Sequence, residues 1–212
     1  MKSRLQEISN ISGFLITSLI VILFAGYFVV TGDKEATHIA INQHHNSFFD
    51  TFFTYATYLG DGVVAPILVL IFGIIYFKKY RFSTFTIGFG TLILVGAFSQ
   101  LLKRMVFEEA LRPSAFIGAD KLYLIPDLEI HTVHSFPSGH TTAAFGLAAF
   151  IAFMFFQKNR LMQIVMVILA SLTGFSRVYL SQHFLEDITV GAALGLFSFL
   201  LIALVIPRRK SI

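Results

Sequence analysis

Long runs of apolar, uncharged residues alternate along the chain with polar segments. A helix that crosses the hydrocarbon core of a bilayer needs about 20 such residues. Six runs approach or reach that length, and they cover residues 11–30, 62–77, 82–102, 141–156, 161–176 and 188–207. The pattern predicts an all-α, polytopic membrane protein with six transmembrane helices.

The composition supports this prediction and excludes other classes. Of the 212 residues, 56% are hydrophobic and 13% are charged, whereas globular proteins carry about 25% charged residues. The absence of Cys excludes disulfides, thiolate metal sites and a Cys nucleophile. The first apolar run is too long for the core of a signal peptide and no cleavage site follows it, so we interpret it as a span.

Six spans define two sides, and the charged residues sort unevenly between them. One side receives a single acidic residue, Glu7, and most of the basic ones: Lys2, Arg4, Lys78, Lys79, Arg81, Lys158, Arg160, Arg208, Arg209 and Lys210. The other side receives every remaining Asp and Glu, with Lys34, Lys103, Arg104, Arg112, Lys121 and Arg177. The positive-inside rule therefore predicts that both termini are cytoplasmic. Since the basic residues lie at the ends of apolar runs, we expect the lipid bilayer and not nucleic acid as a partner.

Three of the apolar runs, those that begin at residues 62, 141 and 161, are short and are completed at their outer ends by polar residues. We therefore expect Asp61, His140 and Arg177 to lie near the outer boundary of the hydrocarbon. A site at this level would meet lipid headgroups. Asp61 itself, between Gly60 and Gly62, is interpreted as part of an interfacial turn.

Two polar segments on the outer side are long. Residues 36–58 combine histidines with aromatic residues at helical spacing, and Ser47 and Asp50 have the spacing of a capping box. This segment is either an external helix in the membrane interface or the outer end of a long second span. Residues 103–136 have the length of a functional loop. Since no linker or repeat divides the chain, we expect one domain, 1–212.

The stretch S-F-P-S-G-H-T-T, residues 135–142, stands at the start of an apolar run. Pro137 fixes its own backbone, Gly139 allows the backbone to approach a ligand, and His140 carries a proton near neutral pH. The run that follows predicts a helix whose free N–H groups face whatever lies against Ser138 and Gly139. These features indicate an anion-binding site.

His183 and Asp187 lie four residues apart at the start of the last apolar run. They project from one face of a helix, so Asp187 can orient the imidazole and support its charge. A histidine held in this way can act as a nucleophile. Arg177, at the end of the preceding run, supplies a planar cation on the same side.

With Lys103 and Arg112, the predicted site would offer three cations, two helix N-termini and two histidines. Phosphoryl transfer requires this combination, because charge on the equatorial oxygens must be stabilised while one group attacks and another protonates the leaving oxygen. In such a scheme the cations take the place of a metal ion. We therefore expect neither a metal site nor a cofactor.

These residues resemble the type 2 phosphatidic acid phosphatase superfamily of membrane lipid phosphatases. The pattern of that family is a Lys and then Arg-Pro, then P-S-G-H, then S-R-x-x-x-x-x-H-x-x-x-D. Residues 137–140 match the second part in full, and Ser176-Arg177 with His183 and Asp187 match the third. The resemblance covers about residues 60–207.

One departure concerns the first part of the pattern. The family usually has six residues between the Lys and the Arg-Pro, whereas eight lie between Lys103 and Arg112. A spacing of six would put Met105 in the place of the cation, where it cannot serve. Either the loop carries two extra residues and Lys103 still reaches the site, or Arg104 takes its place. We favour Lys103, because the uncharged run ends immediately before it.

The resemblance implies a six-helix bundle and a metal-independent phosphatase. His183 would attack phosphorus to form a phosphohistidine while Asp187 fixes its ring. His140 would protonate the leaving lipid oxygen and then activate water. The phosphate would be held by Lys103, Arg112, Arg177 and the backbone around Ser138 and Gly139.

We therefore predict an enzyme that hydrolyses a phosphate ester or diphosphate of a membrane lipid. It would act at the outer face of a bacterial inner membrane, with the active site facing the periplasm or cell exterior. Undecaprenyl diphosphate is the first candidate substrate, followed by phosphatidylglycerophosphate, phosphatidate and the phosphates of lipid A. A lipid phosphotransferase is an alternative, because a phosphohistidine does not dictate its acceptor. A transporter is disfavoured, because transport requires polar groups near the membrane midplane.

Overall fold

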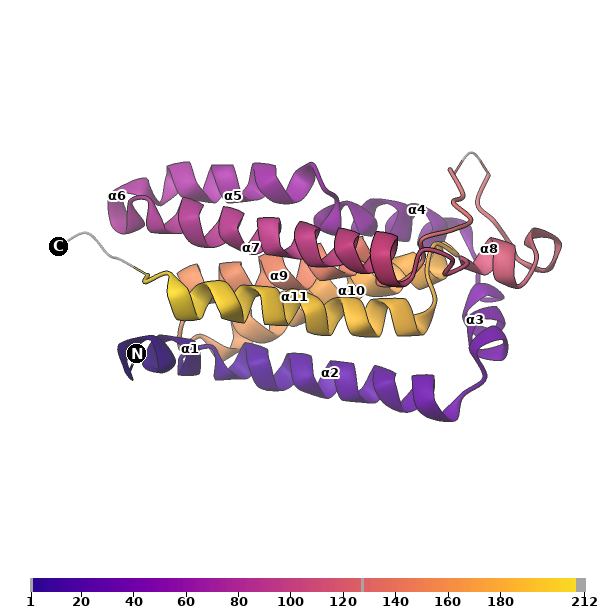
Figure 1. The fold of residues 1–212 in the computed structure, drawn as a ribbon, viewed down its shortest axis with the longest axis horizontal. Coiled ribbons are helices and arrows are strands. Elements are labelled where there is room, and N and C mark those ends of the chain that lie inside the picture. The colour runs from indigo at the N-terminus through magenta and orange to yellow at the C-terminus, as the bar shows by residue number, and fades with distance from the viewer. Residues whose placement is uncertain (1, 127, 209–212) are drawn as a thin grey trace.

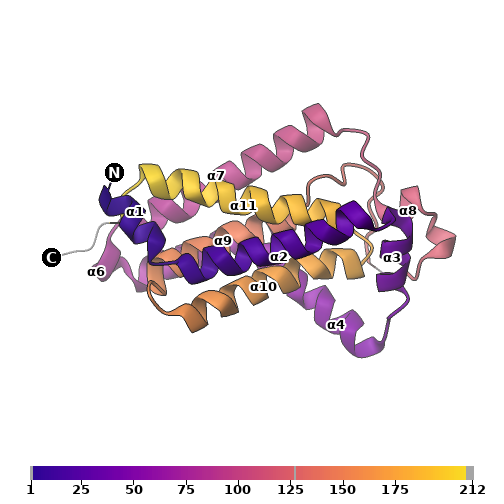
Figure 2. The same ribbon diagram turned by 90° about the horizontal axis from the view of Figure 1, so that it is seen from below.

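The computed structural model describes residues 2–126 and 128–208 and confirms the predicted all-α class. Helices account for 75% of the residues, and the described residues contain no strand. Figure 1 shows an elongated bundle whose long helices run roughly side by side, and Figure 2 shows the same bundle turned by 90°.

In chain order the α-helices are α1 (Lys2–Ser9), α2 (Ser12–Thr31), α3 (Lys34–Asn42), α4 (Ser47–Ala56), α5 (Val64–Ile75), α6 (Phe77–Tyr80), α7 (Ser83–Leu101), α8 (Pro113–Phe116), α9 (Gly139–Phe155), α10 (Arg160–Tyr179) and α11 (Leu185–Val205). Short turns of other helical types are η1 (Thr57–Gly60) and η3 (Ala119–Lys121), which are 3-10 helices, and η2 (Leu102–Val106), which is a π-helix. Each predicted apolar run corresponds to one helix, α2, α5, α7, α9, α10 or α11, and the boundaries agree within three residues.

Helices α2, α7, α10 and α11 are long and apolar enough to cross a membrane. A fifth span results if α5 is counted together with the segment Ser47–Gly60, which meets it at a bend of 61°. Helix α9 is apolar but has 17 residues. These helices support a multi-pass membrane protein, while the count of six spans and the cytoplasmic termini stay predictions.

Helix α9 forms the centre of the bundle, and 13 of its 17 residues are buried. Helices α7, α10 and α11 pack around it. A Cβ added to Gly191 of α11 would lie 2.8 Å from the carbonyl oxygen of Ser138, and one added to Gly195 would lie 2.3 Å from that of Thr142. Such small residues at crossings are typical of helix packing in membranes. The close contact aligns α9 and α11 in parallel, so the starts of the two helices lie together.

The two ends of the bundle differ. Helices α1 and α6 and the end of α11 lie at one end, whereas α3, α4 and α8 lie at the other (Figure 1). The first end includes Lys78 in α6 and Arg208, which donates from Nη2 to the hydroxyl of Tyr80 at 2.8 Å. Of the basic residues used to predict the topology, Arg209 and Lys210 lie outside the described residues.

Residues 36–58, which we predicted as one element, lie in two helices, α3 and α4, that are separated by a break. The bend between α4 and α5 shows that this segment is not a straight extension of the second span. Our prediction of the helix cap was also wrong, because Asn46 and not Ser47 caps α4. Asp50 does not complete a capping box, since its carboxylate accepts a bond from the Tyr179 hydroxyl at 2.6 Å.

The long segment between η2 and α9 is hydrogen-bonded to the helices that precede it. The side chain of Asn42 donates to the carbonyl of Tyr123 and accepts from its N–H, both at 2.9 Å. The hydroxyl of Tyr123 donates to Asp50 Oδ2 at 3.2 Å. These bonds hold the segment against α3 and α4, beside the polar end of the bundle.

Candidate active site

A cavity of about 430 Å³ lies among α5, α7, α9 and the loop before α11. Six of the eight predicted site residues line it, namely Lys103, Arg112, Gly139, His140, Arg177 and His183. Other lining residues are apolar and include Ala65, Leu92 and Ala143. The cavity therefore combines cationic and apolar walls, which suits an anion that carries a hydrocarbon chain.

The loop before α9 is fastened to the start of α11. The N–H of Ser138 donates to the carbonyl of Asp187 at 3.0 Å, and the buried side chain of Ser138 caps α9 by accepting from Thr141. Gly139 and His140 are the first residues of α9, where N–H groups have no carbonyl partner within the helix. A Cβ added to Gly139 would meet no atom within 4 Å. An anion can therefore approach the start of α9 closely.

His183 lies in the short loop between α10 and α11. Its N–H donates to the carbonyl of Arg177 at 3.0 Å, and its Nδ1 lies 3.2 Å from Asp187 Oδ2. Burial, together with the positive charges of Arg112 and Arg177, holds the pKa of His183 well below its usual value. A neutral ring whose Nδ1–H donates to Asp187 has a free lone pair on Nε2. A histidine in this state can attack an electrophile.

Asp187 lies behind the cavity wall and joins the two motifs. Its Oδ2 accepts from the hydroxyl of Ser135 at 2.5 Å and from the N–H of Phe184 at 2.8 Å, in addition to its contact with His183. Ser135 is buried and received no role from the sequence, although it opens the stretch that contains P-S-G-H. The available signal was a hydroxyl residue close to an anion-binding turn.

Arg112 and Arg177 are held by the fold while keeping nitrogens for a ligand. Arg112 donates from Nε to the carbonyl of Val133 and from Nη1 to that of Gln182, both at 2.9 Å. Arg177 donates from Nη1 to the hydroxyl of Thr57 at 2.9 Å, and its buried Nε has no partner among the described residues. Because an unpaired buried donor is unfavourable, a bound anion is the expected partner of Nε.

Lys103 and not Arg104 reaches the cavity. The helix that begins with α7 widens into the π-turn η2, and Lys103 lies in this turn and lines the cavity. Arg104 and Met105 are exposed. The π-turn thus accompanies the unusual spacing to Arg112, and π-turns of this kind are frequent at functional sites.

A further carboxylate lies beside His140. Asp61 follows the turn η1, and its Oδ2 is 3.9 Å from His140 Nε2. The sequence identified Asp61 as part of a turn, and its Oδ1 indeed accepts from the N–H of Val63 at 2.8 Å. The contact with His140 escaped sequence analysis, although the expected depth of both residues was a signal. His131, in the segment between η2 and α9, also lines the cavity.

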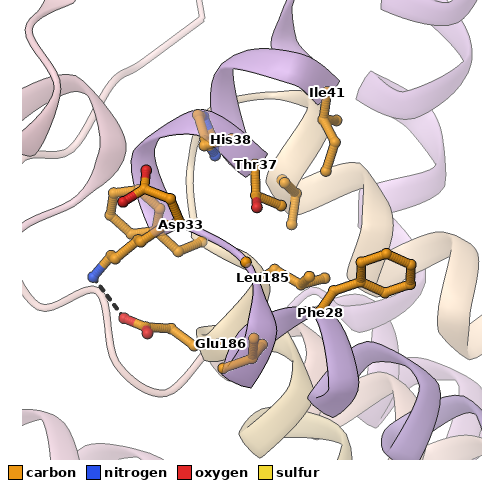
Figure 3. Close-up of a pocket in the computed structure, with 12 residues that line it drawn as sticks. Phe28, Asp33, Thr37, His38, Ile41, Leu185 and Glu186 are labelled. Atoms are coloured by element: carbon orange, nitrogen blue, oxygen red, sulfur yellow. Dashed lines mark hydrogen bonds and ion pairs between the residues drawn. The ribbon is translucent and has the colours of Figure 1, made fainter.

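A second, smaller pocket lies behind the loop that carries His183 (Figure 3). Asp33 and His38 border it, and Lys34 pairs with Glu186 across its edge at 2.6 Å. His38 Nε2 lies 3.1 Å from the hydroxyl of Ser181, and burial lowers the pKa of His38 to about 4. The carboxylates of Asp33 and Glu186 make this pocket unsuitable for an anion. Its residues instead support the loop from behind.

In the part of the chain that the structure describes, no three His, Asp or Glu side chains converge in a way that would hold a metal ion. The site as a whole is a cavity at one end of a helical bundle, with three histidines and three cations on its wall. This arrangement suits a class of membrane protein that binds a phosphate or a similar anion.

Comparison with known families specifies the class. The family model described as the PAP2 superfamily matches residues 83–211. The match covers more than half of the chain, so the protein belongs to the PAP2 superfamily, and the predicted resemblance is confirmed.

Two relatives from Bacillus subtilis (strain 168) are similar along most of the chain. Undecaprenyl-diphosphatase BcrC is 33% identical over 149 residues, which cover 69% of this chain and 69% of that protein. Phosphatidylglycerophosphatase B is 30% identical over 156 residues, which cover 69% of this chain and 70% of that protein. With the family match, these relatives identify the protein as a membrane lipid phosphatase.

Solved structures of similar proteins share the fold. The crystal structure of Aquifex aeolicus LpxE superposes with a TM-score of 0.63 at 24% identity, covering 79% of this chain and 92% of that one. A transmembrane PAP2 type phosphatidylglycerolphosphate phosphatase from Bacillus subtilis superposes with a TM-score of 0.62 at 28% identity. The second alignment covers 92% of this chain and 93% of that one, so nearly the whole bundle is shared.

Proposed function

We propose that this protein hydrolyses a phosphate ester or diphosphate of a membrane lipid through a phosphohistidine intermediate on His183. The observation that carries the proposal is the single cavity lined by Lys103, Arg112, Arg177, His140 and His183. Its cationic residues suit the phosphate, and its apolar residues suit the lipid chain.

In the first step, His183 Nε2 attacks phosphorus and the bond from phosphorus to the lipid oxygen breaks. The hydrogen bond from Nδ1 to Asp187 keeps the ring in the attacking tautomer. Arg112, Arg177 and Lys103, with the N–H groups at the start of α9, stabilise the charge on the phosphoryl oxygens. His140 delivers a proton to the leaving oxygen, so the product is a lipid alcohol or a lipid monophosphate.

In the second step, water attacks the phosphohistidine. His140, now neutral, accepts a proton from this water, and the bond from phosphorus to His183 Nε2 breaks. Inorganic phosphate leaves and His183 is restored. Ser138 and Asp187 hold the loop before α9 against α11 in both steps, because the Ser138 N–H is bonded to the Asp187 carbonyl.

The substrate that we name first is undecaprenyl diphosphate, followed by phosphatidylglycerophosphate, phosphatidate and the phosphates of lipid A. The names of the Bacillus subtilis relatives support the first two. Lipid A phosphatases are also among the similar proteins, for example that of Rhizobium johnstonii (strain DSM 114642 / LMG 32736 / 3841), which is 29% identical over 57% of this chain.

The orientation that we propose places six spans, α2, α5, α7, α9, α10 and α11, in a bacterial inner membrane. The end of the bundle with Lys78 and Arg208 faces the cytoplasm, which follows the positive-inside rule. The cavity then faces the periplasm or cell exterior, at the level of the headgroups. A lipid can present its phosphate there without leaving the bilayer.

The test is phosphate release by the purified protein in detergent, with a chelator present, from each of the four lipids. We expect turnover on at least one lipid, and loss of turnover in His183→Ala and His140→Ala with binding partly retained. His44→Ala is the matched control, because His44 is exposed and lies outside the proposed machinery. Transfer of phosphate to a second lipid would identify a phosphotransferase instead.

Two results would overturn the proposal. Release of phosphate from none of the four lipids would reject the function. Turnover of His183→Ala at the wild-type rate would show that His183 is not the nucleophile, as would an acid-labile phosphoryl label on the protein that persists in this variant.

A further inference from the structure

The turn Thr57–Gly60 and the following Asp61 precede residue 83, so they lie outside the residues that the family model matches. Gly60 nevertheless lines the cavity. Thr57 accepts a hydrogen bond from Arg177 at 2.9 Å. A Cβ added to Gly60 would lie 2.2 Å from the carbonyl oxygen of His140, so the turn packs directly on the first turn of α9. These contacts fix the turn against α10, which carries Arg177, and against α9, which carries His140.

Asp61 is placed by this packing with one oxygen engaged and the other directed at His140. Its Oδ1 accepts from the N–H groups of Val63 at 2.8 Å and Val64 at 3.3 Å. These bonds hold the pKa of Asp61 below its ordinary value, so the carboxylate is charged. Its Oδ2 lies 3.9 Å from His140 Nε2, and both side chains are about one third exposed, at 32% and 31%.

Neighbouring positive charges oppose the protonation of His140, and the negative charge of Asp61 can offset them. The proposed mechanism needs a proton on His140 when the leaving oxygen departs, but Arg177, Lys103 and Arg112 all face the same cavity. These three positive charges disfavour a fourth one on the His140 ring. The imidazole of His183 also lies nearby and is neutral, so it offers no compensating charge. Asp187 is engaged by three donors on the far side of His183.

We propose that Asp61 is a positioning residue that keeps His140 protonated for the departure of the lipid oxygen, a role that rests on the proposed function. The imidazolium charge is shared by both ring nitrogens, so a carboxylate beside Nε2 supports the protonated ring whichever nitrogen serves the substrate. A separation of 3.9 Å is an ion-pair contact and not a hydrogen bond. The ring therefore keeps its freedom to turn toward the leaving oxygen.

The test compares Asp61→Asn with wild type on two leaving groups. The leaving group of phosphatidate is the alkoxide of diacylglycerol, which needs a proton, whereas that of p-nitrophenyl phosphate is a stable phenolate, which needs almost none. We expect the kcat for phosphatidate to fall by roughly 10- to 100-fold, since general acid catalysis contributes about this much or more. The burst of p-nitrophenol that accompanies phosphoenzyme formation stays within about threefold of wild type, because that step does not draw on His140 as an acid.

The pH profile supplies a second readout. Removing the negative charge lowers the proton affinity of His140, so the basic limb of the phosphatidate profile moves to lower pH in Asp61→Asn. Asp61→Glu, which keeps the carboxylate, recovers part of the activity. Asp120→Asn is the matched control, because it makes the same change of charge at an exposed position in the segment between η2 and α9.

Three outcomes would overturn this role. Equal losses on both substrates would mean that the turn is only structural. No loss on phosphatidate would mean that His140 does not depend on Asp61. If wild type acts on neither substrate nor on the other lipids of the panel, the proposed function itself fails and this role with it. In the His140→Ala background, Asp61→Asn should add little further loss on phosphatidate.

Discussion

Two regions of the molecule meet at the cavity, and they are held together differently. The loop before α9 and the start of α11 form the first region, where His183 and Asp187 are almost fully buried and are joined by a hydrogen bond of 3.2 Å. The turn after α4 and the first turn of α9 form the second, where Asp61 and His140 are about one third exposed and make a longer contact. The first region is closed and the second is open.

This difference corresponds to the different tasks that we propose for the two histidines. An attacking group gains from a fixed tautomer and orientation, which buried hydrogen bonds provide. A proton donor must contact a leaving group that then departs, which an open, loosely held ring permits. The two regions also differ in their position along the chain. The first lies within residues 83–211, which the family model matches, whereas Asp61 of the second lies before them.

The largest expected effect is in the closed region, from Asp187→Asn. The His183 ring, Ser135 and Phe184 all donate to Asp187 Oδ2. A neutral amide oxygen accepts these bonds more weakly than a carboxylate and supplies no charge to the imidazole. We expect kcat to fall by about a thousandfold or more, as when the orienting carboxylate of a hydrolase triad is neutralised. The measurement is kcat for phosphate release, with the unfolding temperature as a check on folding. A loss smaller than about tenfold would show that Asp187 does not orient His183.

Much of the closed region could be predicted because its residues are neighbours in sequence. A spacing of four places His183 and Asp187 on one helix face, and P-S-G-H marks the start of α9 by local backbone chemistry alone. The six apolar runs likewise predict the long helices within three residues. Periodicity and spacing are local properties, so a single sequence expresses them directly.

Other contacts could not be predicted because they depend on how distant segments pack. Ser135 is meaningful only when the loop before α9 lies against α11, and Asp61 only when its turn lies against His140. The cap of α4 shows the same limit on a small scale. Ser47 and Asp50 fit a capping box, but the Tyr179 hydroxyl, far away in sequence, engages Asp50.

A smaller effect is expected from Ser135→Ala, which tests whether the closed region extends beyond the motifs. The hydroxyl of Ser135 donates to Asp187 Oδ2 at 2.5 Å, and a hydrogen bond to a charged group contributes about 1.5–3 kcal/mol. We therefore expect kcat to fall by roughly 10- to 100-fold with little change in KM. Ser135→Thr, which keeps a hydroxyl, should recover activity.

Ser47→Ala is the control for Ser135→Ala, because Ser47 is exposed on α4. The phosphoryl label on His183 should accumulate more slowly in Ser135→Ala, which a loss of stability alone would not cause. If Ser135→Ala and Ser47→Ala release phosphate at the same rate, the hydroxyl has no part in positioning Asp187.

The smallest effect on activity, but a measurable one on stability, is expected from His38→Gln. His38 supports the loop of His183 from the helices before residue 83, through its contact with Ser181 at 3.1 Å. Burial lowers the pKa of His38 to about 4, and the charge of Asp187 offsets this only in part. An unfolded chain binds a proton at His38 below about pH 6.5 while the folded protein does not.

Between pH 6.5 and 4 the unfolded state therefore binds a proton at His38 that the folded state does not bind. The contribution of neutral His38 to the free energy of unfolding is fully present above pH 6.5 and is lost progressively as the pH falls. At pH 5 this loss is about 2 kcal/mol, and it is absent in His38→Gln. Between pH 7 and pH 5, the unfolding temperature of wild type should fall by roughly 4–8 °C more than that of the variant. Thermal unfolding in detergent measures this, and parallel pH dependences would contradict it. We expect the activity of His38→Gln at pH 7 to stay within about threefold of wild type. His38 would then differ from Asp61, because it supports the loop but takes no part in the reaction.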